Sequence, residues 1–184
     1  MTVAQTLDAR SPVFVDEMGT NTSLSPLYGW AKKGERDYCS VPRNRGKNTT
    51  PLASMSLEGM GPSLAVEGAT TARVFETYLE RVLVPSLSRG QVVVMDNLSA
   101  HKGERVREPI EGRGCELFYL PSYSPDFNPI EEAFGKIKGL LRKVQARSRE
   151  VLLEAIGAAI SAITDQDARG FFEHCGYRAM VQSF

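Results

Sequence analysis

The chain has 184 residues, of which 42% are hydrophobic and 24% are charged, as is usual for one globular domain with its own core. No apolar run approaches the ~20 residues that a membrane-spanning helix needs, and no secretory signal is visible, so we expect a cytoplasmic protein without a membrane partner. The 22 basic residues balance 22 acidic ones, and the three cysteines form no Cys-x-x-Cys pair, which disfavours an overall basic nucleic-acid-binding protein and a structural zinc site.

The first third of the chain is predicted to consist mainly of strands. Residues 12–17 (PVFVDE) alternate as a short strand that ends near Asp16. Residues 28–42 are predicted as two short strands around a turn, with Trp30 packed inside that hairpin in preference to stacking on a nucleic-acid base. Residues 50–68 are predicted as two further strands joined by a turn.

The rest of the chain alternates helices and strands. Thr70 or Thr71 can cap the first predicted helix, and Asn128 can cap a later one whose first residue is Pro129. The predicted elements, in order, are a helix to about residue 87, a buried strand over 91–97, a helix over 103–111, a strand over 115–121, and helices over 129–144, 150–164 and 168–176. This order predicts an α/β fold with one mixed sheet flanked by helices.

Three acids stand where such a fold would place a site. Asp16 and Asp96 each end an apolar strand, and Glu131 lies in the first turn of a helix. Each also has an ordinary structural explanation: Asp96 with Asn97 suits a turn, and Asn128-x-x-Glu131 has the spacing of a capping box. Taken singly, none of the three acids identifies a catalytic site.

The helix that carries Glu131 has a distinct flank beside its predicted apolar stripe. The stripe comprises Ile130, Phe134, Ile137, Leu141 and Val144, and the flank comprises Glu131, Gly135, Lys138 and Arg142. A carboxylate, a gap and two cations in that order would suit a metal-bound phosphate followed by more nucleic-acid backbone. The alternative is an ordinary solvated flank.

Four segments resemble the catalytic core of mariner-type bacterial insertion-sequence transposases, which are DDE superfamily endonucleases: FVDE at 14–17, VVVMDNLSAHK at 92–102, YLPSYSPDFNPIEEAFGKIK at 119–138 and FFEHCGY at 171–177. The third segment is the most specific. In that family 34 residues separate the second acid from the third, as they do between Asp96 and Glu131. The resemblance implies an RNase H-like fold.

The resemblance also implies the chemistry. Asp16, Asp96 and Glu131 match the family's metal-binding acids, which would hold two Mg²⁺ (or Mn²⁺) ions. Two such ions ~3.5–4 Å apart can activate a water and stabilise a leaving oxygen. The implied reaction is hydrolysis of double-stranded DNA at transposon ends, followed by strand transfer into target DNA at TA sites. Asn97 and His101 match family positions beside the metal site.

Basic residues in two stretches are predicted to contact DNA phosphates without reading sequence. They are Lys32, Lys33, Arg36, Arg43, Arg45 and Lys47 before the second predicted strand, and Lys138 and Arg142 on the acid-bearing helix. The alternative is that these charges only solvate exposed faces.

The resemblance covers nearly the whole chain, so we divide it into an N-terminal extension at 1–12 and a catalytic domain at 13–184. Relatives carry helix-turn-helix modules before the first acid, whereas a dozen residues precede FVDE here. We therefore expect the catalytic half of a bacterial, nucleoid-associated transposase, acting as a homodimer or together with an upstream DNA-binding polypeptide.

Three alternatives remain at this point. The domain could be another RNase H-like nuclease that cuts without joining, or an inactive remnant that binds DNA. The acids could also merely cap turns and helices, in which case they would lie too far apart to share metal ions.

Overall fold

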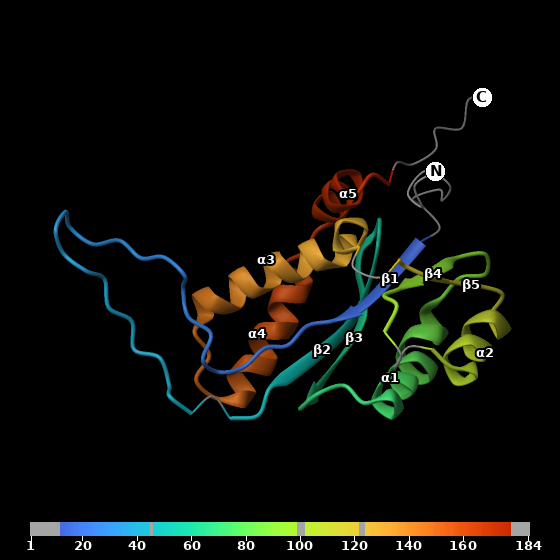
Figure 1. Ribbon diagram of the computed structural model, residues 1–184, viewed down its shortest axis with the longest axis horizontal. Coiled ribbons are helices and arrows are strands. Elements are labelled where there is room, and N and C mark those ends of the chain that lie inside the picture. The colour runs from blue at the N-terminus through green and yellow to red at the C-terminus, as the bar shows by residue number, and fades with distance from the viewer. Residues whose placement is uncertain (1–11, 45, 99–101, 122–123, 178–184) are drawn as a thin grey trace.

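The computed structural model describes residues 12–44, 46–98, 102–121 and 124–177 (Figure 1). A five-stranded sheet with the order β3-β2-β1-β4-β5 forms its centre. The strands are β1 (Pro12–Glu17), β2 (Thr49–Ser56), β3 (Gly59–Glu67), β4 (Val92–Met95) and β5 (Glu116–Tyr119). β1 is antiparallel to β2 and parallel to β4, which is parallel to β5, so the predicted mixed sheet is confirmed.

Alternation along β1 divides the core into two layers. Phe14 belongs to the apolar cluster on one face of the sheet, and Val13 and Val15 belong to the cluster on the other face. Because side chains of a strand alternate between faces, Asp16 follows Phe14 and points to the same face. Asp16 is nevertheless a charged residue of which only 6% is exposed.

Three helices cover the face that Phe14 shares. They are α3 (Pro129–Val144), α4 (Arg149–Ser161) and α5 (Asp165–His174), which lie together on one side of the sheet in Figure 1. Ser148 caps α4, and Thr164 caps α5 in a reciprocal capping box with Asp167, so both helices begin close to the predicted positions. Of the predicted apolar stripe on α3, Val144 is the exception, since it is half exposed at the end of the helix.

The other face is covered by α1 (Ala72–Tyr78) and α2 (Glu104–Gly112). Thr71 caps α1, as one of the two predicted candidates. The helix predicted to reach residue 87 changes geometry on the way, with a π-helical turn at Leu79–Leu83 and a 3₁₀ turn at Val84–Ser86. Pro85 lacks the N–H that a continued α-helix would use, which accounts for the change. Among the described residues, no helix is long and apolar enough to cross a membrane.

A long arm connects β1 to β2. Residues 21–48 leave the body of the protein and return to it, as Figure 1 shows, and we call this segment the arm. The strands predicted over 28–42 are absent there, although a turn is present where the Glu35 N–H donates to the Lys32 carbonyl and Gly34 has a φ of 92°. Trp30 is fully exposed, so its predicted packing inside a hairpin is wrong. Two strands without a covering layer are marginally stable in water, which explains the open conformation.

Candidate active site

The parallel register of β1 and β4 brings two of the predicted acids side by side. Val15 pairs with Met95 in the last position of the ladder, and Asp16 and Asp96 are the next residue on each strand. Adjacent strands lie ~4.8 Å apart, and residues in register on parallel strands point to the same face. Both aspartates therefore leave the carboxyl ends of neighbouring strands toward the side that α3 covers.

Asp16 is held by two donors. The Glu17 backbone N–H donates to its Oδ1 at 2.7 Å, and the Asn128 Nδ2 donates to its Oδ2 at 2.7 Å. Burial, together with the negative charges of Glu131 and Asp96, raises the pKa of Asp16 from 3.8 to about 7, although the two hydrogen bonds lower it. The three predicted acids are thus within electrostatic reach of one another.

Glu131 reaches this region from the first turn of α3, where its side chain is exposed. Asn128 is the N-cap residue, as predicted, but its side chain makes no capping hydrogen bond to the helix. It turns to Asp16 instead, 112 residues away in sequence. The sequence could not predict the contact with Asp16, because a capping box is recognised from residues that are close together in the sequence.

The donor chemistry of the three acids fits a hard divalent cation, which prefers carboxylate oxygens. In the part of the chain that the structure describes, no group of three or more His, Cys, Asp and Glu side chains is close enough to hold a metal ion. Glu131 and Asp96 both act electrostatically on Asp16, but the three carboxylates do not close around one point. Mutual repulsion favours this separation, and a cation would reverse it.

The other residues predicted beside the site have mixed outcomes. Asn97 follows Asp96 directly and is half-buried, while Asp96 accepts a hydrogen bond from the Leu98 N–H at 3.3 Å, as in an Asx turn. His101 lies outside the described residues. Met18, two residues after Asp16, is 2% exposed and packs in the core.

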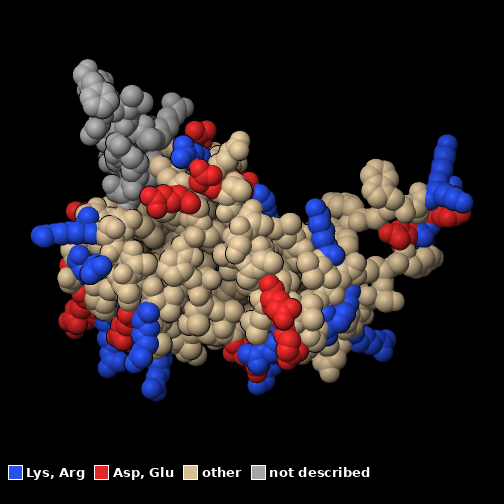
Figure 2. Space-filling view, turned by 180° about the vertical axis from the view of Figure 1, so that it is seen from behind, with Lys and Arg blue, Asp and Glu red and all other residues tan. Residues whose placement is uncertain are grey.

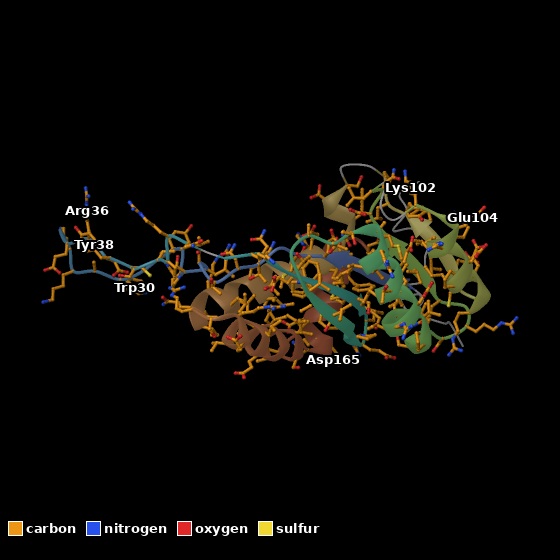
Figure 3. The ribbon with its side chains drawn as sticks, turned by 90° about the horizontal axis from the view of Figure 1, so that it is seen from below. Trp30, Arg36, Tyr38, Lys102, Glu104 and Asp165 are labelled. Carbon is orange, nitrogen blue, oxygen red and sulfur yellow. The ribbon has the colours of Figure 1, made fainter. Side chains whose placement is uncertain are left out.

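The basic residues predicted to contact DNA before β2 have different surroundings in the structure. Lys32, Lys33, Arg36 and Arg43 are exposed on the arm. Figure 2 shows basic and acidic side chains together at the end of the arm, and Figure 3 shows Arg36, Trp30 and Tyr38 there, far from the sheet. Arg45 lies outside the described residues. Lys47 is paired with Glu67 of β3 at 2.9 Å, so it is part of a structural ion pair.

Two cations follow Glu131 along one flank of α3, as predicted. Lys138 and Arg142 are half-buried there, and the structure shows no ion pair for either within its described residues. At 3.6 residues per turn they lie within ~20° of Glu131 around the helix axis. Their neighbour Lys136 instead pairs with Asp167 of α5 at 2.6 Å.

A depression beside Glu131 contains a residue pair that sequence reasoning missed. A cavity of about 320 Å³ is lined by Asp126, Glu131, Glu132 and His174. The His174 Nδ1 contacts the Glu132 carboxylate, and this hydrogen bond raises the pKa of His174 above its usual value. His174 is within the FFEHCGY segment, whose role the sequence alone did not indicate. The pair joins the end of α5 to the start of α3.

Comparison with known proteins identifies the family of this chain. The family model for the DDE superfamily endonuclease matches residues 11–153, which include all three acids. The chain belongs to the DDE superfamily endonuclease family. It is 28% identical over 129 residues to the Tcb1 transposase of Caenorhabditis briggsae, covering 68% of this chain and 47% of that protein. It is 25% identical over 161 residues to the Tc1 transposase of Caenorhabditis elegans, covering 82% and 59%. The chain thus spans about half the length of these curated relatives.

Solved structures place the fold. The chain superposes on the Mos1 transposase in a paired-end complex with the left transposon end, with a TM-score of 0.71, 16% identity, and coverage of 91% of this chain and 53% of that one. It superposes on the isolated catalytic domain of Mos1 mariner transposase with a TM-score of 0.65 and 18% identity, covering 91% and 81%. The DDE endonuclease domain therefore has the predicted RNase H-like fold.

Proposed function

We propose that this domain is the catalytic part of a Tc1/mariner-type DNA transposase, with Asp16, Asp96 and Glu131 as the ligands of divalent metal. The parallel register of β1 and β4 is the observation that carries the proposal, because it sets Asp16 and Asp96 side by side facing the helix that bears Glu131. The relatives Tc1 and Tcb1 are transposases, and the Mos1 catalytic domain has been solved with Mg and with Mn. We further propose that the site holds two metal ions and that the transposase comes from a bacterial insertion sequence.

The chain's own residues have separable roles in the proposed reaction. Asp16 and Asp96 supply rigid carboxylates from strand ends, and Glu131 supplies one from a helix that packs on β1. Bound divalent cations would activate the attacking water and stabilise the leaving oxygen. Water breaks a phosphodiester at the transposon end, and the freed 3′-hydroxyl then attacks a target phosphodiester and displaces its 3′ oxygen.

Contacts with DNA are proposed for two surfaces. Lys138 and Arg142 would hold the backbone that continues past the reacting phosphate, since they lie on the flank of Glu131. Lys32, Lys33, Arg36 and Arg43 would bind phosphates through the exposed arm. We also propose that the domain acts as a homodimer or together with an upstream DNA-binding polypeptide, since the related Mos1 transposase was solved in a paired-end complex with transposon-end DNA.

A cleavage and joining assay tests the proposed function. Nicking is measured by incubating supercoiled plasmid with the domain and Mn²⁺ or Mg²⁺. Joining is measured in a second reaction that also contains duplex DNA from either side of the reading frame, as the candidate transposon end. We expect metal-dependent nicking and joined products, both lost in Asp96→Asn and Glu131→Gln and both kept in Glu154→Gln, an exposed acid on α4.

The outcomes separate the alternatives. Nicking without any joined product would favour an RNase H-like nuclease over a transposase. Nicking that survives in Asp96→Asn would overturn the assignment of the acids, and no metal-dependent reaction at all would favour an inactive DNA-binding remnant.

A further inference from the structure

The hydrogen bond between Asn128 and Asp16 joins the two elements that carry the proposed metal ligands. Asp16 is the second-to-last residue of β1, and Asn128 stands immediately before α3, three residues before Glu131. The Nδ2···Oδ2 distance is 2.7 Å, and both residues are about nine-tenths or more buried, with 5% of Asn128 and 6% of Asp16 exposed. A buried amide that donates to a buried carboxylate fixes the orientation of both groups, because neither has water to turn to.

The position of Asn128 is itself braced from the other side. The Tyr177 hydroxyl donates to the carbonyl of Phe127, the residue before Asn128, at 2.8 Å. The Tyr177 ring packs edge-on against Phe14, with centroids 5.1 Å apart, and Phe14 is two residues before Asp16 on β1. The Tyr177 side chain thus contacts both the backbone beside Asn128 and the strand that carries Asp16.

Helix capping does not explain why an asparagine stands here. Asparagine is favoured at an N-cap because its side chain accepts hydrogen bonds from the first turn. Asn128 makes no such bond, and its side-chain donor is directed to the Asp16 carboxylate. Asparagine offers an N–H₂ donor of the required length, which serine, threonine and aspartate do not.

We propose that Asn128 is a positioning residue for the metal site: it donates to one oxygen of Asp16 so that the carboxylate keeps a fixed orientation toward Asp96 and Glu131. It touches neither metal nor DNA in this role. Residues that hydrogen-bond a ligating carboxylate commonly change metal affinity by ~10–100-fold when they are replaced. This inference rests on the proposed function, because it assumes that Asp16 binds metal.

Two substitutions separate positioning from helix stability. Asn128→Ser and Asn128→Ala both remove the donor to Asp16, but only serine keeps a side chain that can cap α3. We expect Mn²⁺ titrations followed by calorimetry to show a Kd raised by ~10-fold in both variants. Thermal unfolding of the metal-free proteins should differ between them, with the alanine variant the less stable. Asn44→Ser, an exposed change on the arm, should leave the Kd unchanged.

An independent spectroscopic signal follows the hydrogen bond without metal. In the metal-free domain, the side-chain ¹⁵N–¹H resonances of Asn128 should be protected from solvent exchange and should shift in Asp16→Ala, whereas those of Asn44 should do neither. Unprotected Asn128 resonances would overturn the inference, as would an unchanged Kd for Mn²⁺ in both Asn128 variants. A wild-type domain that binds no Mn²⁺ would overturn the proposed function together with the inference, whereas binding lost in Asp16→Asn but unaltered in Asn128→Ser would overturn the inference alone.

Discussion

At the scale of single residues, Asp16 is a group that destabilises the fold when no metal is bound. It is a buried carboxylate whose pKa is raised to about 7 by burial, and two further negative charges act on it. Natural proteins retain such groups where function needs them, at a cost in stability. The cost should be measurable in the metal-free protein.

We predict that Asp16→Asn stabilises the metal-free domain above neutral pH. A pKa that rises from 3.8 to about 7 on folding favours the folded state below pH ~4, and this contribution is lost as the pH rises through 7. The full effect corresponds to at most ~4 kcal/mol, and the hydrogen bonds that an amide at this position cannot accept reduce the gain to roughly 1–2 kcal/mol. The measurement is urea unfolding of both proteins in EDTA from pH 5 to pH 8.

The test uses the difference in free energy of unfolding between Asp16→Asn and the wild type, because the contributions of other titrating groups cancel in that difference. We expect the variant's advantage to grow between pH 5 and pH 7 and then level off. A difference that stays constant with pH would show that Asp16 is not buried in a charged form.

At the scale of elements, α3 combines an apolar stripe with a functional flank. A Cβ built on Gly135 or Gly139 meets nothing within 4 Å, so neither glycine is needed for packing. Glycine in a helix costs ~0.5–1 kcal/mol relative to alanine. Gly135 lies on the flank between Glu131 and Lys138, where the DNA backbone is proposed to approach.

Gly135→Ala and Gly139→Ala therefore form a matched pair. Each should raise the free energy of unfolding by ~0.5–1 kcal/mol. Only Gly135→Ala should reduce metal-dependent plasmid nicking, by several-fold, because its methyl group occupies the proposed path of the backbone. If both variants nick DNA as the wild type does, the flank is an ordinary solvated surface.

The sequence predicted elements well where a periodic pattern coincided with burial. The apolar run before Asp96 indicated a central strand, and the cap at Thr71 marked the start of α1. The pattern overlooked Pro85, whose missing N–H leaves a gap in the hydrogen bonds of the preceding turn, and α-helical geometry ends at Tyr78. The role of Asn128 could not be predicted, because its partner is 112 residues away and the local signal pointed to a cap.

At the scale of the whole molecule, the arm is the largest departure from the sequence-based prediction. Alternation and a turn signal at residues 28–42 indicated strands, but those signals carry no information on whether another layer covers them. The arm is tied to the body at its base, where the Arg147 guanidinium donates to the carbonyls of Thr22, Leu24 and Ser40 at 3.0–3.4 Å. These contacts give Arg147 a structural role.

We predict that Arg147→Ala loosens the arm. Trp30 is the only tryptophan of the chain and is fully exposed on the arm, so its fluorescence reports arm motion. The amplitude of the fast component in the time-resolved anisotropy decay of Trp30 should increase in Arg147→Ala. Lys143→Ala, an exposed change near the end of α3, should leave the decay unaltered. Equal decays in all three proteins would mean that Arg147 does not restrain the arm.

The convergence of three carboxylates from separate elements is the central claim, and a crystal of the domain soaked in Mn²⁺ tests it most directly. We expect anomalous scattering peaks bounded by the carboxylates of Asp16, Asp96 and Glu131, with the three side chains closer together than in the metal-free protein. Manganese bound only elsewhere on the protein, or bound without one of these three side chains, would contradict it.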